Sequence, residues 1–255
     1  MNLLKRVLVA LIFIPLLLYI FNAGGILLIS LLAIIATMMN YEFIKMLKIS
    51  KLNLIFPPAI VFSIAYNRYD YLIFTLFLSA ILSMGKDVFA NKLSGSIKRV
   101  SLAIFGLVYS SVFIALLYNI RLMQKGNYLV ILLIVLIWIT DTFAYFTGML
   151  LGKHRNIVSA SPNKSLEGFI GGFLFSFAAS IGAYFILPIE MKQAIFAAIS
   201  AGIFGQFGDL LESMIKRDAG VKDSSHIIPG HGGILDRFDS LIIAAPVFYF
   251  LMRFF

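Results

Sequence analysis

Four carboxylates and four basic residues alternate around a glycine-rich turn between residues 213 and 239. Glycines let backbone N–H groups converge on an anion, basic side chains pair with phosphate oxygens, and carboxylates can hold Mg²⁺. The segment therefore predicts a site where a divalent cation meets phosphate groups; the alternative is a solvated charged loop. The carboxylates are Asp218, Asp223, Asp236 and Asp239, and the basic residues are Lys216, Arg217, Lys222 and Arg237.

Asp236 and Asp239 lie three residues apart at the start of the last apolar segment, 234–255. A helix over this range would span about 33 Å, enough to cross a bilayer. Residues three apart share a helix face, and acidic groups are favoured near a helix N-terminus. The two residues form a candidate seat for a divalent cation. The alternative is that they only cap the helix and pair with Arg237.

Three more carboxylates lie inside apolar segments. Asp209 and Glu212, again three apart, belong to the segment 192–215, with Asp209 roughly 9 Å of helix rise from its end. Asp141 lies deeper in the segment 128–150. An ionisable group at such depth is costly, which makes Asp209 and Asp141 candidate functional residues. The alternative is a structural carboxylate satisfied by a Lys, Thr or backbone partner.

The polar loop before residue 166 holds a second candidate for anion binding. Residues 161–165 read Ser-Pro-Asn-Lys-Ser and predict an anion-binding turn at a helix start, or only a helix cap. Residues 148–154 superficially resemble a P-loop, but the spacing is one residue short and His154 stands where Mg²⁺ needs Ser or Thr. His154, His226 and His231 form no i, i+4 pair, so zinc is not expected.

The elements that position these residues must be membrane helices. The 255 residues are 61% hydrophobic and 13% charged, with a mean hydropathy of +0.97 and no cysteine. Soluble domains carry about 45–50% apolar and about 25% charged residues, so a soluble enzyme is excluded. We expect an all-α polytopic membrane protein with about nine transmembrane helices. The apolar runs are 7–21, 25–40, 54–66, 71–84, 101–120, 128–150, 166–188, 192–215 and 234–255.

Basic residues predict the orientation. With the N-terminus inside, 16 of the 21 Lys and Arg residues fall in cytoplasmic segments and 5 on the opposite side. This bias predicts an N-in, C-out topology and explains the net charge of +9 without nucleic acid. The first run follows Lys5 and Arg6 without a small-residue cleavage site, so we expect it to be retained. The third and fourth runs are short and could be tilted or broken.

Polar chemistry is concentrated in the second half of the chain. Residues 1–135 consist of apolar runs with short loops and are expected to form a scaffold with possible oligomer contacts. Residues 136–255, with all three histidines and most of the polar loops, are expected to form the catalytic site at the cytoplasmic interface. No internal repeat is found, which gives an inverted-repeat transporter no support.

Residues 213–239 resemble the signature of the phosphatidate cytidylyltransferases, also called CDP-diacylglycerol synthases. The matching order is S-x-apolar-K-R, four residues, K-D, and later P-x-H-G-G-x-x-D-R-x-D, without a departure. A weaker resemblance extends upstream through Asp141 and Thr142 and residues 161–168, where Ser165 replaces a frequent threonine. Residues 1–135 resemble the family only in hydropathy.

The resemblance implies an inner-membrane nucleotidyltransferase that converts CTP and phosphatidic acid to CDP-diacylglycerol and pyrophosphate. It also implies Mg²⁺, possibly K⁺, and a homodimer. Because both reactants are anionic, catalysis must rest mainly on positioning and charge stabilisation. The expected catalytic residues are Asp209, Asp236, Asp239, Lys222 and Arg237, and the expected metal ligands are Asp209, Asp223, Asp236 and Asp239. The expected substrate-binding residues are Lys164, Ser165, Lys216, Arg217, His231, Gly232 and Gly233.

Three competing functions stay open at this point. The same chemistry could act on another lipid phosphate or polyprenyl acceptor. An ion-coupled transporter would use Asp141 and Asp209 as a relay, but would leave the charged segment 213–239 unexplained. A non-catalytic scaffold would tolerate loss of the Asp236 charge.

Overall fold

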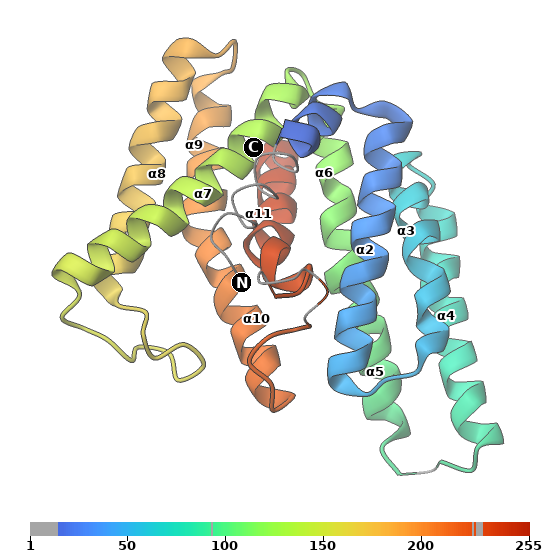
Figure 1. Ribbon diagram of the computed structural model, residues 1–255. Coiled ribbons are helices and arrows are strands. Elements are labelled where there is room, and N and C mark those ends of the chain that lie inside the picture. The colour runs from blue at the N-terminus through green and yellow to red at the C-terminus, as the bar shows by residue number, and fades with distance from the viewer. Residues whose placement is uncertain (1–14, 93, 226, 228–231) are drawn as a thin grey trace.

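The computed structural model describes residues 15–92, 94–225, 227 and 232–255 (Figure 1). Across these residues the protein is a bundle of helices, and no strand is present among them. The prediction of an all-α protein is thereby confirmed for this part of the chain. After a helical stretch at 15–23, the elements are α2 (Gly25–Leu47), η1 (Lys51–Ile55), α3 (Phe56–Ala65), α4 (Tyr69–Phe89), α5 (Ser96–Leu107), η2 (Val108–Val112), α6 (Phe113–Arg121), α7 (Gly126–Leu151), α8 (Leu166–Ile186), α9 (Met191–Ile199), η3 (Ser200–Gly205), α10 (Gln206–Asp218) and α11 (Leu235–Phe254).

Six helical stretches are long and apolar enough to cross a membrane, which supports a multi-pass protein. They are Gly25–Leu47, Tyr69–Phe89, Ser96–Arg121, Gly126–Leu151, Leu166–Ile186 and Met191–Asp218. The expected count of nine is not confirmed. Most of the run 7–21 lies outside the described residues, and the third run forms only the short stretch Lys51–Ala65. Helix α11 carries three charged residues among its first five.

The fourth predicted run is longer than the sequence indicated. The apolar run covers 71–84, whereas α4 begins at Tyr69 and continues through Lys86 and Asp87 to Phe89. Asp87 stays in the helix because Arg99 and Ser96 of α5 bind its carboxylate, at 3.0 and 2.8 Å. A charged partner on the next helix therefore extends α4 beyond its apolar part.

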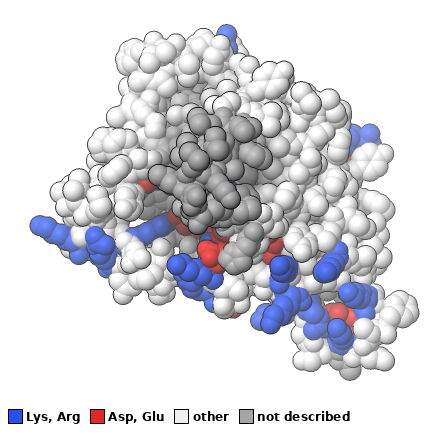
Figure 2. All heavy atoms as spheres, viewed as in Figure 1, with Lys and Arg blue, Asp and Glu red and all other residues white. Residues whose placement is uncertain are grey.

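The connections alternate between two ends of the bundle (Figure 1). One end holds residues 48–55, 90–92, 94–95, 152–165, 219–225 and 232–234, and we call it the basic end. Figure 2 shows Lys and Arg side chains along this edge, with carboxylates among them. At the other end, Arg121 donates to the carbonyls of Phe21 and Asn22, and Arg68 pairs with Asp70 at 3.0 Å.

Close helix packing brings the C-terminal polar segments together. Helices α7 and α8 pack along each other through glycines, since a Cβ on Gly168 would lie 2.8 Å from the carbonyl oxygen of Ala144. Helix α11 packs against η3, α6 and α10, and also touches α2. The start of α8, the end of α10 and the start of α11 thus surround one region at the basic end.

Candidate functional site

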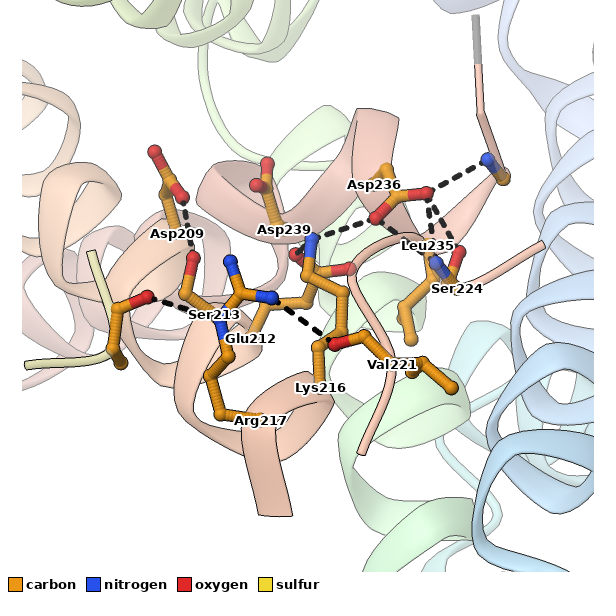
Figure 3. Close-up of polar contacts among 12 residues, drawn as sticks. Asp209, Glu212, Ser213, Lys216, Arg217, Val221, Ser224, Leu235, Asp236 and Asp239 are labelled. Carbon is orange, nitrogen blue, oxygen red and sulfur yellow. Dashed lines mark hydrogen bonds and ion pairs between the residues drawn. The ribbon is translucent and has the colours of Figure 1, made fainter. Parts of the chain in front are cut away.

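The site forms where α10 crosses the first turns of α11. Gly208 permits the crossing, because a Cβ there would lie 2.5 Å from the carbonyl oxygen of Asp239. The next residue, Asp209, is close enough to Asp239 for the two carboxylates to interact electrostatically. Figure 3 shows these two carboxylates on neighbouring helices, with Asp236 nearer the start of α11. The helix crossing thus brings Asp209 and Asp239 into the same region, and their shared role at a cation stays a prediction.

Asp209 is held by one lysine and one hydroxyl. Lys164, from the loop before α8, places its Nζ 2.6 Å from Oδ2 of Asp209. Ser213 donates from one helical turn farther along, at 3.3 Å. Both side chains of the ion pair are about one-third exposed, at 31% and 34%. The lysine partner is the structural alternative considered for Asp209, and it also attaches the 152–165 loop to α10.

Lys216 forms the second ion-pair centre. Its Nζ lies 2.7 Å from Oδ1 of Asp236 and also pairs with Glu212 on the same helix. The side chain of Glu212 is fully buried, and those of Lys216 and Asp236 are only 12% and 10% exposed. One buried cation therefore compensates two carboxylates, and it joins α10 to the start of α11.

Asp236 turns back toward the loop that precedes its helix. It accepts hydrogen bonds from the Gly233 N–H at 2.8 Å, the Ser224 N–H at 3.1 Å and the Ser224 hydroxyl at 2.9 Å. Asp236 thus binds the loop before α11 and not the first N–H groups of the helix, so the capping role considered from the sequence is not seen among the described residues. Asp236 pairs with Lys216, because α10 brings that lysine against the helix start.

Gly232 and Gly233, the part of the glycine turn that the structure describes, both lie against Asp236. Gly232 has a φ of +79° and places its backbone beside Asp236, and the Gly233 N–H is already bound to that carboxylate. The prediction that both glycines offer free N–H donors to a substrate is therefore not supported for Gly233. His231 lies outside the described residues.

Ser165 is a helix cap and not an exposed phosphate ligand. Its side chain accepts from the Gly168 N–H at 3.1 Å, and the residue is only 4% exposed. Gly148 and Gly152 of the α7 end pack against the same hydroxyl. Close α7–α8 packing buries Ser165 as a cap, so its expected substrate-binding role stays a prediction, whereas the preceding Lys164 is 31% exposed.

The remaining predicted residues lie at the outer rim of the basic end. Lys222, Asp223 and Arg237 are exposed. Arg217 is also exposed and donates to the carbonyls of Ala160 and Val221, at 3.4 and 3.3 Å. The structure leaves these rim residues accessible to a soluble ligand, whereas Lys164 and Lys216 lie deeper.

Glu42 of α2 is a site residue that the sequence analysis missed. Its carboxylate is fully buried and accepts hydrogen bonds from Ser224, Ser225 and the backbone of Ile234 and Leu235. A carboxylate next to an apolar run is a signal for such a role, but nothing in the local sequence identifies partners more than 180 positions away. The first part of the chain thus contributes to the site.

The described residues do not contain a ready-made metal site. Among them, no three His, Asp or Glu side chains are grouped closely enough to hold one metal ion. The expected set of Asp209, Asp223, Asp236 and Asp239 is not assembled, since Asp236 binds Lys216 and Asp223 lies at the rim. Asp209 and Asp239 lie on the two crossing helices (Figure 3), and their carboxylates supply oxygen ligands of the kind that a divalent cation prefers.

Taken together, the fold and the site define a membrane-embedded helical protein with paired acidic and basic side chains at one end. This arrangement is suited to bind anionic groups next to a membrane surface. Residues 4–255 match the cytidylyltransferase family. The chain belongs to that family, as the resemblance predicted.

Named relatives show how far the similarity extends. The phosphatidate cytidylyltransferase of Staphylococcus haemolyticus (strain JCSC1435) is 42% identical over 54% of each chain. That of Staphylococcus aureus (strain COL) is 41% identical over 51% of this chain and 50% of its own. These two alignments therefore span about half the length of each relative. The phosphatidate cytidylyltransferase of Staphylococcus epidermidis (strain ATCC 12228 / FDA PCI 1200) is 34% identical over 98% of this chain and 97% of its own.

Proposed function

We propose that this protein is a phosphatidate cytidylyltransferase, which transfers CMP from CTP to phosphatidic acid and releases pyrophosphate. The observation that carries this proposal is the match to the cytidylyltransferase family over residues 4–255, together with relatives named for this activity. The acidic and basic side chains at the α10–α11 crossing supply a site of suitable chemistry.

The reaction requires two anions to approach each other. A phosphate oxygen of phosphatidic acid attacks the α-phosphorus of CTP, and the bond from that phosphorus to the bridging oxygen of the β-phosphate breaks. The lipid phosphate is already largely deprotonated near neutral pH, so no general base is needed. The residues therefore have to position the reactants and offset negative charge.

Lys164 and Lys216 are the deep cations of the proposed site. Each is now paired with a carboxylate, at 2.6 and 2.7 Å, so each already lies where negative charge is stabilised. Arg217, Lys222 and Arg237 at the rim are accessible to the triphosphate of CTP. In this proposal the rim residues capture CTP, and the deeper lysines hold the reacting phosphates.

Mg²⁺ would be held by Asp209 and Asp239 and would offset charge on the triphosphate. The two carboxylates provide oxygen ligands, which this ion prefers. Asp141 of α7 also interacts electrostatically with Asp239 and lies on the exposed surface of its helix. It is a candidate third contributor, whereas Asp236 acts mainly through Lys216 and Ser224.

The basic end would face the cytoplasm of the inner membrane. This orientation follows from the concentration of Lys and Arg at that end (Figure 2) and corresponds to the N-in, C-out topology. CTP would arrive from the cytosol and phosphatidic acid from the adjoining leaflet. K⁺ as a second cation and assembly into a homodimer are proposed on the family resemblance alone.

The test is an assay of the purified protein with labelled CTP, Mg²⁺ and a panel of acceptors. The panel contains phosphatidic acid, a polyprenyl phosphate, diacylglycerol and no lipid. We expect CDP-diacylglycerol and one pyrophosphate per turnover with phosphatidic acid only. Product from polyprenyl phosphate would redefine the acceptor, and counter-ion-dependent flux without nucleotide turnover would favour a transporter.

A further inference from the structure

The buried carboxylate of Glu42 holds the loop that precedes α11. Its Oε1 accepts from the Ser225 hydroxyl at 2.5 Å and from the Ile234 N–H at 2.9 Å. Its Oε2 accepts from the Ser224 hydroxyl at 3.1 Å and from the Leu235 N–H at 2.7 Å. Each oxygen thus takes one hydroxyl and one backbone N–H.

This arrangement takes the place of an ordinary side-chain cap. The first N–H groups of a helix have no partners within the helix, and they attract negative charge. Ile234, the residue that precedes α11, has an apolar side chain and makes no capping hydrogen bond. Glu42 supplies the acceptor from α2 instead, so the start of α11 is fixed relative to a distant helix.

Ser224 connects Glu42 to the proposed catalytic region. Its hydroxyl lies 3.1 Å from Glu42 and 2.9 Å from Asp236, and its N–H donates to Asp236. Asp236 in turn binds Lys216. A displacement of the loop would therefore move Asp236 and Lys216 together.

Because Glu42 is buried, its hydrogen bonds favour one position of the residues that precede α11. Among the described residues, the Glu42 side chain shows no ion pair with Lys or Arg, and four donors lie within hydrogen-bond distance of its oxygens. The single hydroxyl hydrogen of Ser224 is shared between Glu42 and Asp236. If the loop moved away, a buried carboxylate would lose its partners, which is strongly unfavourable. Gly233 fits this packing, because a Cβ there would lie 2.6 Å from Oε2 of Glu42.

We infer that Glu42 is a positioning residue that fixes Ser224 and Ser225 against the start of α11, and through Ser224 sets the position of Asp236 for nucleotidyl transfer. The inference rests on the proposed function for its catalytic consequence. The contact itself is independent of that function and can be measured separately.

The test compares Glu42→Gln with a control on the same helix. Gln has nearly the same size as Glu, but an NH₂ group replaces one of the two carboxylate oxygens. That NH₂ group then faces the N–H of Ile234 or Leu235, and two donors cannot form a hydrogen bond. Asn40→Ala is the control, because Asn40 is buried on α2 and donates to the carbonyl of Asn53 at 3.1 Å, away from α11. Both variants remove a buried polar interaction of α2.

In Glu42→Gln we expect hydrogen exchange at the amides of Ile234 and Leu235 to accelerate at least about tenfold, with no such change in Asn40→Ala. We expect kcat to fall about 10- to 100-fold, while KM for CTP changes less than about threefold. Unchanged exchange and kcat in Glu42→Gln would overturn the inference. Equal losses of kcat in both variants would also overturn it, because they would indicate only general destabilisation.

Ser225→Ala provides a second variant that keeps Glu42 intact. Ser225 contacts Glu42 but not Asp236, so its removal weakens the contact by a single hydroxyl. We expect a smaller fall in kcat, and less than additive effects when it is combined with Glu42→Gln. Fully additive effects would contradict a shared role. If the unaltered protein made no CDP-diacylglycerol, the proposed function would fail, while the exchange data would still decide the role of Glu42 in holding α11.

Discussion

The amino group of Lys216 lies 2.7 Å from Oδ1 of Asp236 and ties the last turn of α10 to the first turn of α11 (Figure 3). The same lysine also neutralises the fully buried Glu212. Both acidic partners depend on this one cation, so loss of Lys216 would leave the carboxylates of Glu212 and Asp236 without it.

Replacing Lys216 by methionine is expected to destabilise the protein and abolish turnover. Methionine retains most of the volume but leaves two carboxylates without their cation, and breaking a buried ion pair costs about 3–5 kcal/mol. Thermal unfolding in detergent measures the loss. Adding Glu212→Gln should recover part of the stability but no activity, and a double variant no more stable than Lys216→Met would refute the shared-cation interpretation.

Asp236→Asn is expected to leave the protein folded in detergent and to abolish Mg²⁺-dependent pyrophosphate release. The amide retains the shape but removes the charge that orients Lys216 and accepts from Ser224. The matched control is Asp70→Asn, which breaks an exposed ion pair with Arg68 at the opposite end. Turnover retained in Asp236→Asn would remove this residue from the proposed site.

Gly208→Ala is expected to lower activity and stability by separating α10 from α11. A Cβ at this position would lie 2.5 Å from the carbonyl oxygen of Asp239, and such overpacking typically costs about 1–3 kcal/mol. Gly182→Ala in α8 is the control, because nothing lies within 4 Å of its added Cβ. Equal unfolding temperatures and activities for the two variants would show that the crossing has room to adjust.

Cation binding near Asp209 and Asp239 is expected to change the fluorescence of Trp138, the single tryptophan of the chain. Trp138 lies three residues before Asp141 on α7, so the two share a helix face. We expect Mg²⁺ to alter the emission of the unaltered protein, and Asp239→Asn to need at least about tenfold more Mg²⁺ for the same change. Equal Mg²⁺ titrations would exclude Asp239 as a ligand.

Asp141→Asn separates two roles for that carboxylate. If Asp141 helps to hold the cation, its variant should shift the Mg²⁺ titration as Asp239→Asn does, because the two charges interact. If it only helps helix packing, the titration should be unchanged and turnover should fall less than in Asp236→Asn. Pyrophosphate release measured over a range of Mg²⁺ concentrations distinguishes the two results.

Several features of this protein follow from composition and local order alone. An excess of apolar residues in long runs leaves helices as the means to satisfy the backbone within a bilayer, so the all-α class needed no tertiary information. The spacing of residues 213–239 was sufficient to indicate the family. Asp209 could be proposed as a functional residue from the sequence, because an ionisable group inside an apolar segment is costly, and that role stays a prediction.

Tertiary contacts decided which partner each charge has. The sequence could not place Lys216 between Glu212 and Asp236, or Glu42 against Ser224 and Ser225, because those contacts depend on how α2, α10 and α11 pack. The same packing buried Ser165 as a cap and turned the Gly233 N–H toward Asp236. Helical periodicity determines which residues share a face, but only the packing of the helices determines what that face meets.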